Sequence, residues 1–299
     1  MLIGLVHAFF IWYGDILVYY ALLGFFLPFF FKRSPKAILI WAVSFFLVLI
    51  LIMTLLVVSM GMLDEVSHET FMQAYFADIE NRLESSFYAY GQGTFAEIMS
   101  QRVDDVLFMY GQFPFQALLI LPLFLLGLYV GKRGILQDIE GNMPFIKKVW
   151  MWGFIIGFPM SIIAYISRIQ IDPAFASGYD LLHVSTMILA NTGLSMFYVT
   201  SIVLLYQNRE WILRLKPLAY VGRMALTNYL LQSIICIMIF YSFGLGLYGQ
   251  VSPAWGLALT IVIFTVQVFI SRYWLKRYRF GPMEWVWRSL TYGKLSKMN

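Results

Sequence analysis

Long apolar runs separated by short polar segments dominate this sequence. Seven of the runs reach the length of about 20 residues that an α-helix needs to cross a hydrocarbon core of about 30 Å. Their apolar positions do not alternate with polar ones, as the strands of a membrane barrel would. We therefore predict an all-α fold, a polytopic transmembrane helical bundle with spans at residues 15–31, 37–60, 113–131, 149–167, 181–206, 218–243 and 254–275.

The apolar residues 2–13, LIGLVHAFFIWY, are too few to make an eighth span. Twelve helical residues rise only about 18 Å. They predict an incomplete N-terminal helix, the second half of a helix whose start lies upstream. Together with the seven spans it is expected to form one integral membrane domain over residues 1–299.

Two polar regions interrupt the apolar pattern. Residues 61–105 hold nine acidic side chains and only two basic ones, and residues 71–87 are amphipathic at helical spacing. We expect 61–112 to be an extracytoplasmic loop with amphipathic helices that lie on the bilayer surface. Residues 276–299 contain two tryptophans among basic residues, which predicts a cytoplasmic interfacial tail.

Composition and charge agree with a membrane location. The chain is 61% hydrophobic and 12% charged, whereas soluble domains carry about 25% charged residues. If the turn after the first span is cytoplasmic, 18 of the 21 Lys and Arg fall on the cytoplasmic side. This pattern predicts a multi-pass protein of the bacterial plasma membrane with a cytoplasmic C-terminus. The lipid bilayer is its expected partner.

The net charge of +5 does not indicate nucleic-acid binding, because the basic residues form short clusters between spans. The sequence contains no zinc-type Cys/His cluster, no Walker loop and no GxGxxG motif. It therefore predicts no metal site.

His7 and Asp15 are the first candidate site residues. Both lie within the apolar stretch HAFFIWYGDILVYYALLG, where an ionisable side chain is costly unless it faces protein or trapped water. A carboxylate beside an imidazole fixes its tautomer and raises its basicity, so His7 and Asp15 are candidate catalytic residues. The structural alternative is that Asp15 caps the following helix and His7 bonds a neighbouring carbonyl.

A second polar group, GRMALTNYLLQS, contains Arg223, Asn228 and Gln232. Arg223, at the start of the 218–243 span, is a candidate for binding a phosphate or carboxylate at the cytoplasmic mouth. Asn228 and Gln232 share a helix face and are candidate substrate-binding residues, although interhelical hydrogen bonds explain such side chains in many bundles. His183 is a further candidate, in a span with a polar outer half. Arg102 is expected to be a surface charge.

Four strings resemble one family: LIGLVHAFFIWYGDILVYYALLGF, GQGTFAEIMSQR, VGRMALTNYLLQS and RFGPMEWVWRSLTYGK. They are similar to the YeiB-like bacterial inner-membrane proteins, classed as domain of unknown function 418. Members of that family usually carry further N-terminal segments, including helices with an Asp-Arg-Gly and a Leu-Phe-Gly motif, and this sequence has neither. The family is distantly similar to membrane acyltransferases that use an intramembrane histidine.

The resemblance implies an acyltransferase-like enzyme that moves an acyl group from a cytoplasmic donor, such as acyl-coenzyme A (acyl-CoA), to an envelope acceptor. In that hypothesis His7 is the base and Arg223 meets the phosphates of the donor. A small-molecule transporter or exporter is the alternative, and a non-catalytic envelope membrane protein is a third. The sequence lacks the repeated halves and paired broken helices that favour a transporter.

Overall fold

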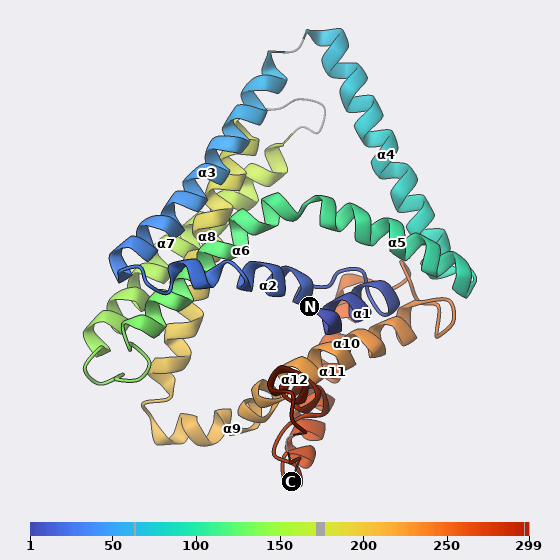
Figure 1. Ribbon diagram of the computed structural model, residues 1–299. Coiled ribbons are helices and arrows are strands. Elements are labelled where there is room, and N and C mark those ends of the chain that lie inside the picture. The colour runs from blue at the N-terminus through green and yellow to red at the C-terminus, as the bar shows by residue number, and fades with distance from the viewer. Residues whose placement is uncertain (63, 172–176, 296, 299) are drawn as a thin grey trace. The chain divides into compact units, whose positions relative to one another are not determined.

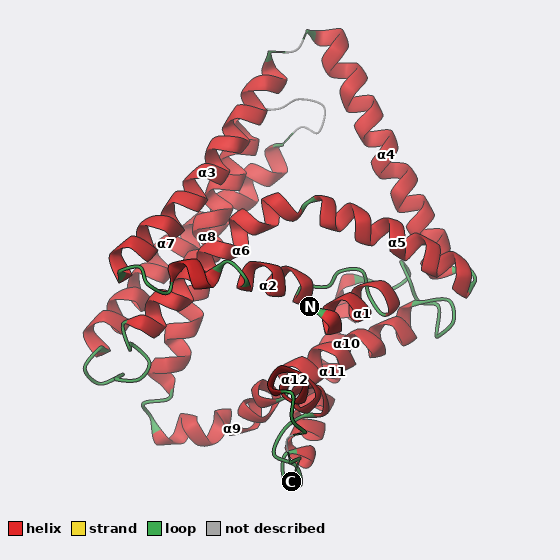
Figure 2. Ribbon diagram, viewed as in Figure 1, coloured by secondary structure: helices red, strands yellow, loops and turns green. Residues whose placement is uncertain are grey.

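The computed structural model describes residues 1–62, 64–171, 177–295, 297 and 298, and this part is helical without a β-strand (Figure 2). Residue 63 of the expected outer segment and residues 296 and 299 of the expected tail lie outside it. Figure 1 labels the helices. Their bounds are α1 Leu2–Phe10, α2 Leu17–Gly24, α3 Pro35–Gly61, α4 Glu65–Gly91, α5 Phe95–Gly111, α6 Phe113–Lys132, α7 Met143–Gln170, α8 Gly178–Leu205, α9 Arg209–Arg223, α10 Ala225–Phe240, α11 Pro253–Trp274 and α12 Pro282–Tyr292, with a 3-10 turn at Leu27–Phe30.

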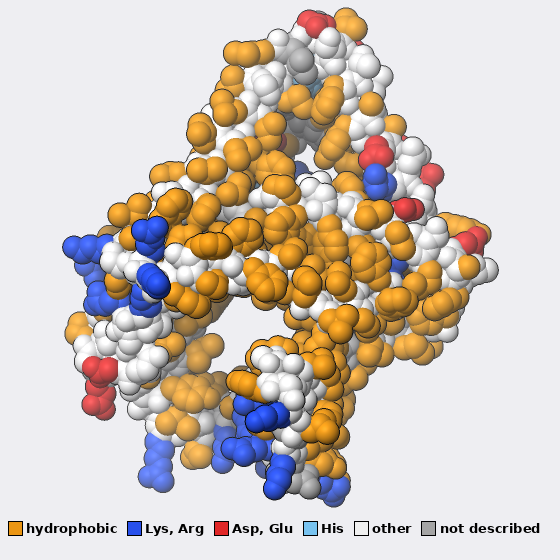
Figure 3. All heavy atoms as spheres, in the orientation of Figure 1, with side chains coloured by type: hydrophobic (Ala, Val, Ile, Leu, Met, Phe, Trp, Pro, Cys, Tyr) orange, Lys and Arg blue, Asp and Glu red, His pale blue; other side chains and the backbone are white. Residues whose placement is uncertain are grey.

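Five of these helices are long and apolar enough to cross a membrane: α3, α6, α7, α8 and α11. The bent pair of α9 and α10 brings the number to six if it is one span. Hydrophobic side chains cover much of the visible molecular face (Figure 3), and most side chains of the five helices are not buried within the protein. The predicted all-helical, multi-pass membrane architecture is confirmed, and lipid is the environment that such apolar surfaces require.

The expected span at 15–31 is not one continuous helix. The eight residues of α2 rise only about 12 Å, and the chain then tightens into the 3-10 turn Leu27–Phe30. Pro28 lies in that turn, where it lacks the backbone N–H that a continuing α-helix would use.

The expected span at 218–243 is also different. It is divided at Met224, where α9 and α10 meet at a bend of 76°. Arg223 therefore ends α9 instead of beginning a span. The two differences explain why the structure has fewer candidate spans than the seven expected.

The chain forms two compact units, which we describe separately. The first unit comprises Met1 and residues 16–80 and 108–206. In it α7 packs along α8, and α3 packs against α6 through Ile38, Ala42 and Leu125. A Cβ atom added at Gly157 of α7 would come within 2.6 Å of the backbone nitrogen of Leu194 in α8. Small residues at this crossing therefore allow the two backbones their close approach.

The second unit comprises residues 2–15, 81–107 and 207–299, and thus contains α1, the end of α4, most of α5, and α9 to α12. Its polar interior is organised around the start of α10. The carboxylate of Glu284 in α12 accepts hydrogen bonds from the backbone N–H of Thr227 at 2.9 Å and from its hydroxyl at 2.5 Å. This contact joins two of the motifs singled out in the sequence, VGRMALTNYLLQS and RFGPMEWVWRSLTYGK.

Candidate functional site

The side chains of His7 and Asp15 are in contact. Nδ1 of His7 lies 2.8 Å from Oδ1 of Asp15, and both side chains are fully buried. Helix α1 ends at Phe10, and the loop that follows returns the chain so that Asp15 reaches back to the helix. Gly14 supplies room in this loop, since a Cβ atom there would lie 2.7 Å from the Trp12 ring.

The N-cap position of α2 is Ile16, whose own side chain makes no capping hydrogen bond. The Asp15 carboxylate contacts the imidazole of His7, because a buried carboxylate needs hydrogen-bond donors and the nearby His7 provides one.

The contact with Asp15 selects the tautomer of a neutral His7. An ionised carboxylate only accepts hydrogen bonds, so beside an ionised Asp15 the neutral imidazole carries its proton on Nδ1, which leaves a free lone pair on Nε2. Nε2 is buried and finds no hydrogen-bond partner among the described residues. The ring of Tyr229 lies against the imidazole, with centroids 4.9 Å apart. The Tyr229 hydroxyl approaches Oδ1 of Asp15 at 3.5 Å, a long contact.

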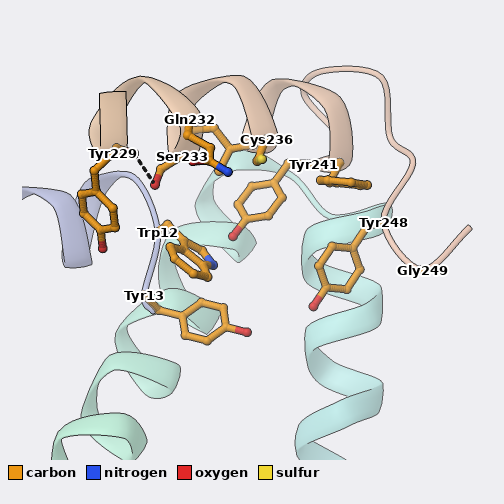
Figure 4. A pocket seen from close by; sticks show the side chains of 11 residues that line it. Trp12, Tyr13, Tyr229, Gln232, Ser233, Cys236, Tyr241, Tyr248 and Gly249 are labelled. Atoms are coloured by element: carbon orange, nitrogen blue, oxygen red, sulfur yellow. Dashed lines mark hydrogen bonds between the residues drawn. The ribbon is translucent and has the colours of Figure 1, made fainter. Parts of the chain in front are cut away.

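An aromatic cavity of about 420 Å³ lies beside this group. We call it the aromatic cavity, and Figure 4 shows the rings that turn toward one another beneath α10. Its lining residues are Trp12, Tyr13, Tyr229, Gln232, Ser233, Cys236, Ile237, Phe240, Tyr241, Tyr248 and Gly249. Large aromatic surfaces with a few hydroxyl and amide groups suit an organic ligand that carries its own polar groups.

Behind the aromatic cavity, Tyr90 supports the wall residue Tyr241. The hydroxyl of Tyr90, at the end of α4, donates to Oδ2 of Asp105 at 2.6 Å, and Gln101 donates to Oδ1 at 3.0 Å. The Tyr90 ring stacks on Tyr241 with centroids 4.6 Å apart. The end of α4 and α5 therefore help to shape the cavity.

Tyr241 contributes a buried phenol to this wall. Its side chain is buried, and its hydroxyl finds no hydrogen-bond partner among the described residues. Burial raises the pKa of Tyr241, and it raises the pKa of Tyr248 to about 12. Both phenols therefore stay protonated at neutral pH and can donate to a ligand oxygen.

A second cavity, of about 470 Å³, lies between α1, α10 and α12. We call it the apolar cavity. Its lining residues are Leu2, Ile3, Val6, His7, Ile11, Thr227, Leu230, Leu231, Ile234, Met283, Val286 and Leu290.

The two cavities use different faces of α10. Thr227, Leu231 and Ile234 follow the spacing of one helix face, whereas Tyr229 and Ser233 belong to another. His7 lines the apolar cavity and Tyr229 lines the aromatic one, so their two rings, which contact each other at a tilt, form part of the wall between the cavities.

Gln232 is a predicted site residue that lines the aromatic cavity. Asn228 does not line either cavity. Its Nδ2 donates to the hydroxyl of Ser271 at 2.9 Å and to the Val221 carbonyl at 3.3 Å, while Gln267 donates to its backbone carbonyl at 2.8 Å. Asn228 thus bridges the bend at Met224 and α11.

Arg223 and His183 also lie away from the cavity walls. Arg223 is exposed, and its Nη2 donates to the Arg279 carbonyl at 3.2 Å. His183 belongs to the first unit, and its Nδ1 lies 2.8 Å from the Ala164 carbonyl oxygen. His183 therefore makes no part of the site described here.

The expectation that Arg102 is a surface charge is wrong. Arg102 is 1% exposed, its guanidinium lies 5.7 Å from the centre of the Tyr241 ring, and its Nη1 approaches the sulfur of Met99. The ring face attracts the cation and keeps it in the protein. The sequence offered one signal for this burial. Arg102 is the single arginine of the segment GTFAEIMSQRVDDVLF, and it shares a helix face with the apolar residues Ile98 and Val106.

Sequence reasoning also missed Trp12, Tyr13, Tyr241 and Tyr248. In a chain with 18% aromatic residues, single tyrosines do not stand out. No group of three or more His, Cys, Asp or Glu side chains able to hold a metal ion occurs in the described part of the chain.

The apolar helices are those of a multi-pass membrane protein, and the buried polar site lies beside an internal cavity. A family model described as protein of unknown function (DUF418) matches residues 130–294. The chain is 36% identical to the uncharacterized protein YxaH of Bacillus subtilis over 302 residues, which is 98% of this chain and 69% of that protein.

The uncharacterized protein YeiB of Escherichia coli is 26% identical over 295 residues, 97% of this chain and 73% of its own length. A 39.9 kDa protein encoded in the amylase 3' region of Bacillus acidopullulyticus is 39% identical over 101 residues, 34% of this chain and 29% of its own. No solved structure matches the chain significantly. The chain belongs to the YeiB-like DUF418 family, and the resemblance expected from its motifs is confirmed.

Proposed function

We propose that this protein is a membrane-bound acyltransferase-like enzyme that moves an acyl group from acyl-CoA to a hydroxyl- or amine-bearing envelope acceptor. One observation carries the proposal. A buried histidine is bonded through Nδ1 to a buried aspartate, its Nε2 is unpartnered among the described residues, and a cavity lies on each side of the wall that it helps to form. General-base chemistry needs this combination of an oriented imidazole and space for two reactants.

The reaction proceeds as follows in this proposal. Nε2 of His7 takes the proton of the acceptor hydroxyl while its oxygen attacks the thioester carbonyl carbon. The C–S bond then breaks, and the coenzyme A thiolate leaves with the proton that His7 carried. Asp15 keeps the imidazole in the productive tautomer and stabilises its positive charge between the two steps. The products are an acyl ester and free coenzyme A.

The roles of the remaining residues follow from their positions. Tyr241, Gln232 and Ser233 contact the acceptor in the aromatic cavity, where their polar groups line the space. Arg223 meets donor phosphates, because its guanidinium is exposed at the end of α9. Asn228 holds the bend that sets the direction of α10 and acts on the substrate only through that geometry.

The location also belongs to the proposal. The positive-inside distribution of Lys and Arg supports a cytoplasmic C-terminus and a cytoplasmic α12 in a bacterial plasma membrane. The residues of 61–112 then lie outside. In this orientation the apolar cavity, which α12 lines, is on the donor side, and the aromatic cavity is on the acceptor side.

Release of free thiol from acetyl-, octanoyl- and hexadecanoyl-CoA by the purified protein in detergent tests the proposal, with water or an added envelope carbohydrate fraction as acceptor. The wild type should release thiol, the His7→Gln variant should lose most of this activity, and the His183→Gln variant should keep it. Equal release by wild type and His7→Gln, or no release with any of the three donors, overturns the proposal.

A further inference from the structure

The apolar cavity is suited to a hydrocarbon chain. Ten of its twelve lining residues are aliphatic or methionine, and the two others are His7 and Thr227. Its volume of about 470 Å³ lies within the range of about 300–1,000 Å³ that small-molecule sites occupy. An acetyl group would leave most of this space to water, which an apolar lining disfavours.

One wall of the apolar cavity carries a reactive group. His7 is the ionisable residue of the lining, and its buried Nε2 has no partner among the described residues. A buried nitrogen with a free lone pair is costly unless a ligand supplies a donor. The hydroxyl of the acceptor would supply that donor, and the carbonyl end of a chain that fills the cavity would lie beside it at the wall that His7 shares with Tyr229.

The polypeptide around α12 has the charge that an acyl-CoA head requires. Residues 272–297 hold seven Lys and Arg and one acidic residue, Glu284. Glu284 is already engaged with Thr227, so the basic side chains there dominate. Arg288 lies on α12 between the cavity residues Val286 and Leu290. Arginine is well suited to phosphate because its fork makes two charge-assisted hydrogen bonds.

We propose that the apolar cavity between α1, α10 and α12 binds the hydrocarbon chain of a fatty acyl-CoA, whose phosphates lie against the basic residues of α9 and the C-terminal tail. The inference rests on the proposed function and adds the class of donor to it. The enzyme uses long acyl chains in preference to acetyl groups, because each methylene that enters the cavity removes apolar surface from water.

A photoreactive donor, hexadecanoyl-CoA with a diazirine near the middle of its chain, tests this on the detergent-purified full chain. Illumination should label peptides of α1, α10 and α12, and unlabelled hexadecanoyl-CoA should compete where acetyl-CoA does not. Leu231→Trp and Val286→Trp place a large ring in the cavity, and each should lower labelling at least fivefold. Leu257→Trp is the matched control, because Leu257 is exposed on α11, and it should leave labelling unchanged.

Two outcomes overturn the inference. One is labelling spread over exposed surfaces such as α11, without competition. The other is labelling that neither tryptophan in the cavity reduces while both variants keep the wild-type thermal transition. Specific labelling without thiol release from any donor would support the acyl-chain site in the apolar cavity and would contradict the proposed acyltransferase activity. If thiol is released from acetyl-CoA as fast as from hexadecanoyl-CoA, without specific labelling, the proposed activity is supported and the acyl-chain site is contradicted.

Discussion

The imidazole of His7 and the phenol ring of Tyr229 lie against each other with their planes tilted by 46° and their centroids 4.9 Å apart, although 222 positions separate the two residues. Each lines a different cavity, and Asp15 contacts both side chains. The contact places the imidazole of α1 against α10 at the boundary between the two cavities. Substitutions in this wall are expected to change the rate of the reaction, whereas substitutions at positions that only pack helices together are expected to change the free energy of unfolding.

Asp15→Asn should lower kcat strongly with little change in KM. The asparagine amide can donate to Nδ1 of His7, which moves the imidazole proton to Nε2 and removes the lone pair that acts as base. General-base catalysis contributes about 10²–10⁴-fold, so the expected loss is at least 10²-fold. Thiol-release kinetics measure it. Asp180→Asn, in the capping box of α8, is the control and should keep the wild-type kcat.

Tyr241→Phe and Tyr90→Phe should separate binding from stability. The Tyr241 hydroxyl has no protein partner among the described residues, so its removal should not lower the unfolding free energy, but it should raise the KM for the acceptor about tenfold. The Tyr90 hydroxyl donates to Asp105, so its removal should cost about 1–3 kcal/mol of stability. Thermal unfolding in detergent and acceptor titration distinguish the two. Equal destabilisation by both variants would contradict the ligand role of Tyr241.

Gly157→Ala should destabilise the first unit. The new Cβ atom would lie 2.6 Å from the Leu194 backbone nitrogen and would push α7 and α8 apart, at a cost of about 1–3 kcal/mol. Gly127→Ala in α6 is the control, because a Cβ atom there meets nothing within 4 Å. We expect Gly127→Ala to leave the unfolding temperature unchanged or raise it, since alanine favours helix over glycine. A transition unaffected by Gly157→Ala would show that the helices are not closely packed there.

The first turn of α5 should lose protection from hydrogen exchange in acid. Hydrogen bonds from the backbone and hydroxyl of Thr94 hold the pKa of Glu97 below its usual 4.5. Because the folded pKa is lowered, the cap contributes stability above pH 4.5 and loses it as pH falls through the lower folded value. Exchange at the start of α5 measures this. Glu97→Ala should show weak protection at every pH, and an unchanged pH profile in that variant would refute the cap.

The membrane architecture could be predicted from the sequence because lipid demands about 20 consecutive apolar residues for each helix. That rule does not locate breaks in a helix, so the bend at Met224 and the short α2 were missed. The short α2 lies within an apolar run, and the bend at Met224 lies near the start of the predicted 218–243 span, directly after Arg223.

The candidate base could also be found, because ionisable residues are rare in apolar segments. The walls of its cavities could not. Tyr13 is distant in the chain from Tyr241 and Tyr248, and aromatic residues in a membrane protein usually indicate interfaces. The buried Arg102 needed the tertiary contact with Tyr241 to be recognised. Arg223 and Asn228 were selected because polar side chains are rare in such a segment. In the structure Arg223 donates to the carbonyl of Arg279 in the tail, and Asn228 donates to the Val221 carbonyl across the helix bend.

Chemical rescue of a His7→Gly variant tests the central claim most directly. The substitution removes the base and leaves a space the size of an imidazole beside Asp15. We predict that the variant releases thiol from hexadecanoyl-CoA at least 10²-fold more slowly than wild type, and that added imidazole restores part of the rate in a saturable manner. A folded His7→Gly variant with wild-type activity, independent of imidazole, would contradict the account.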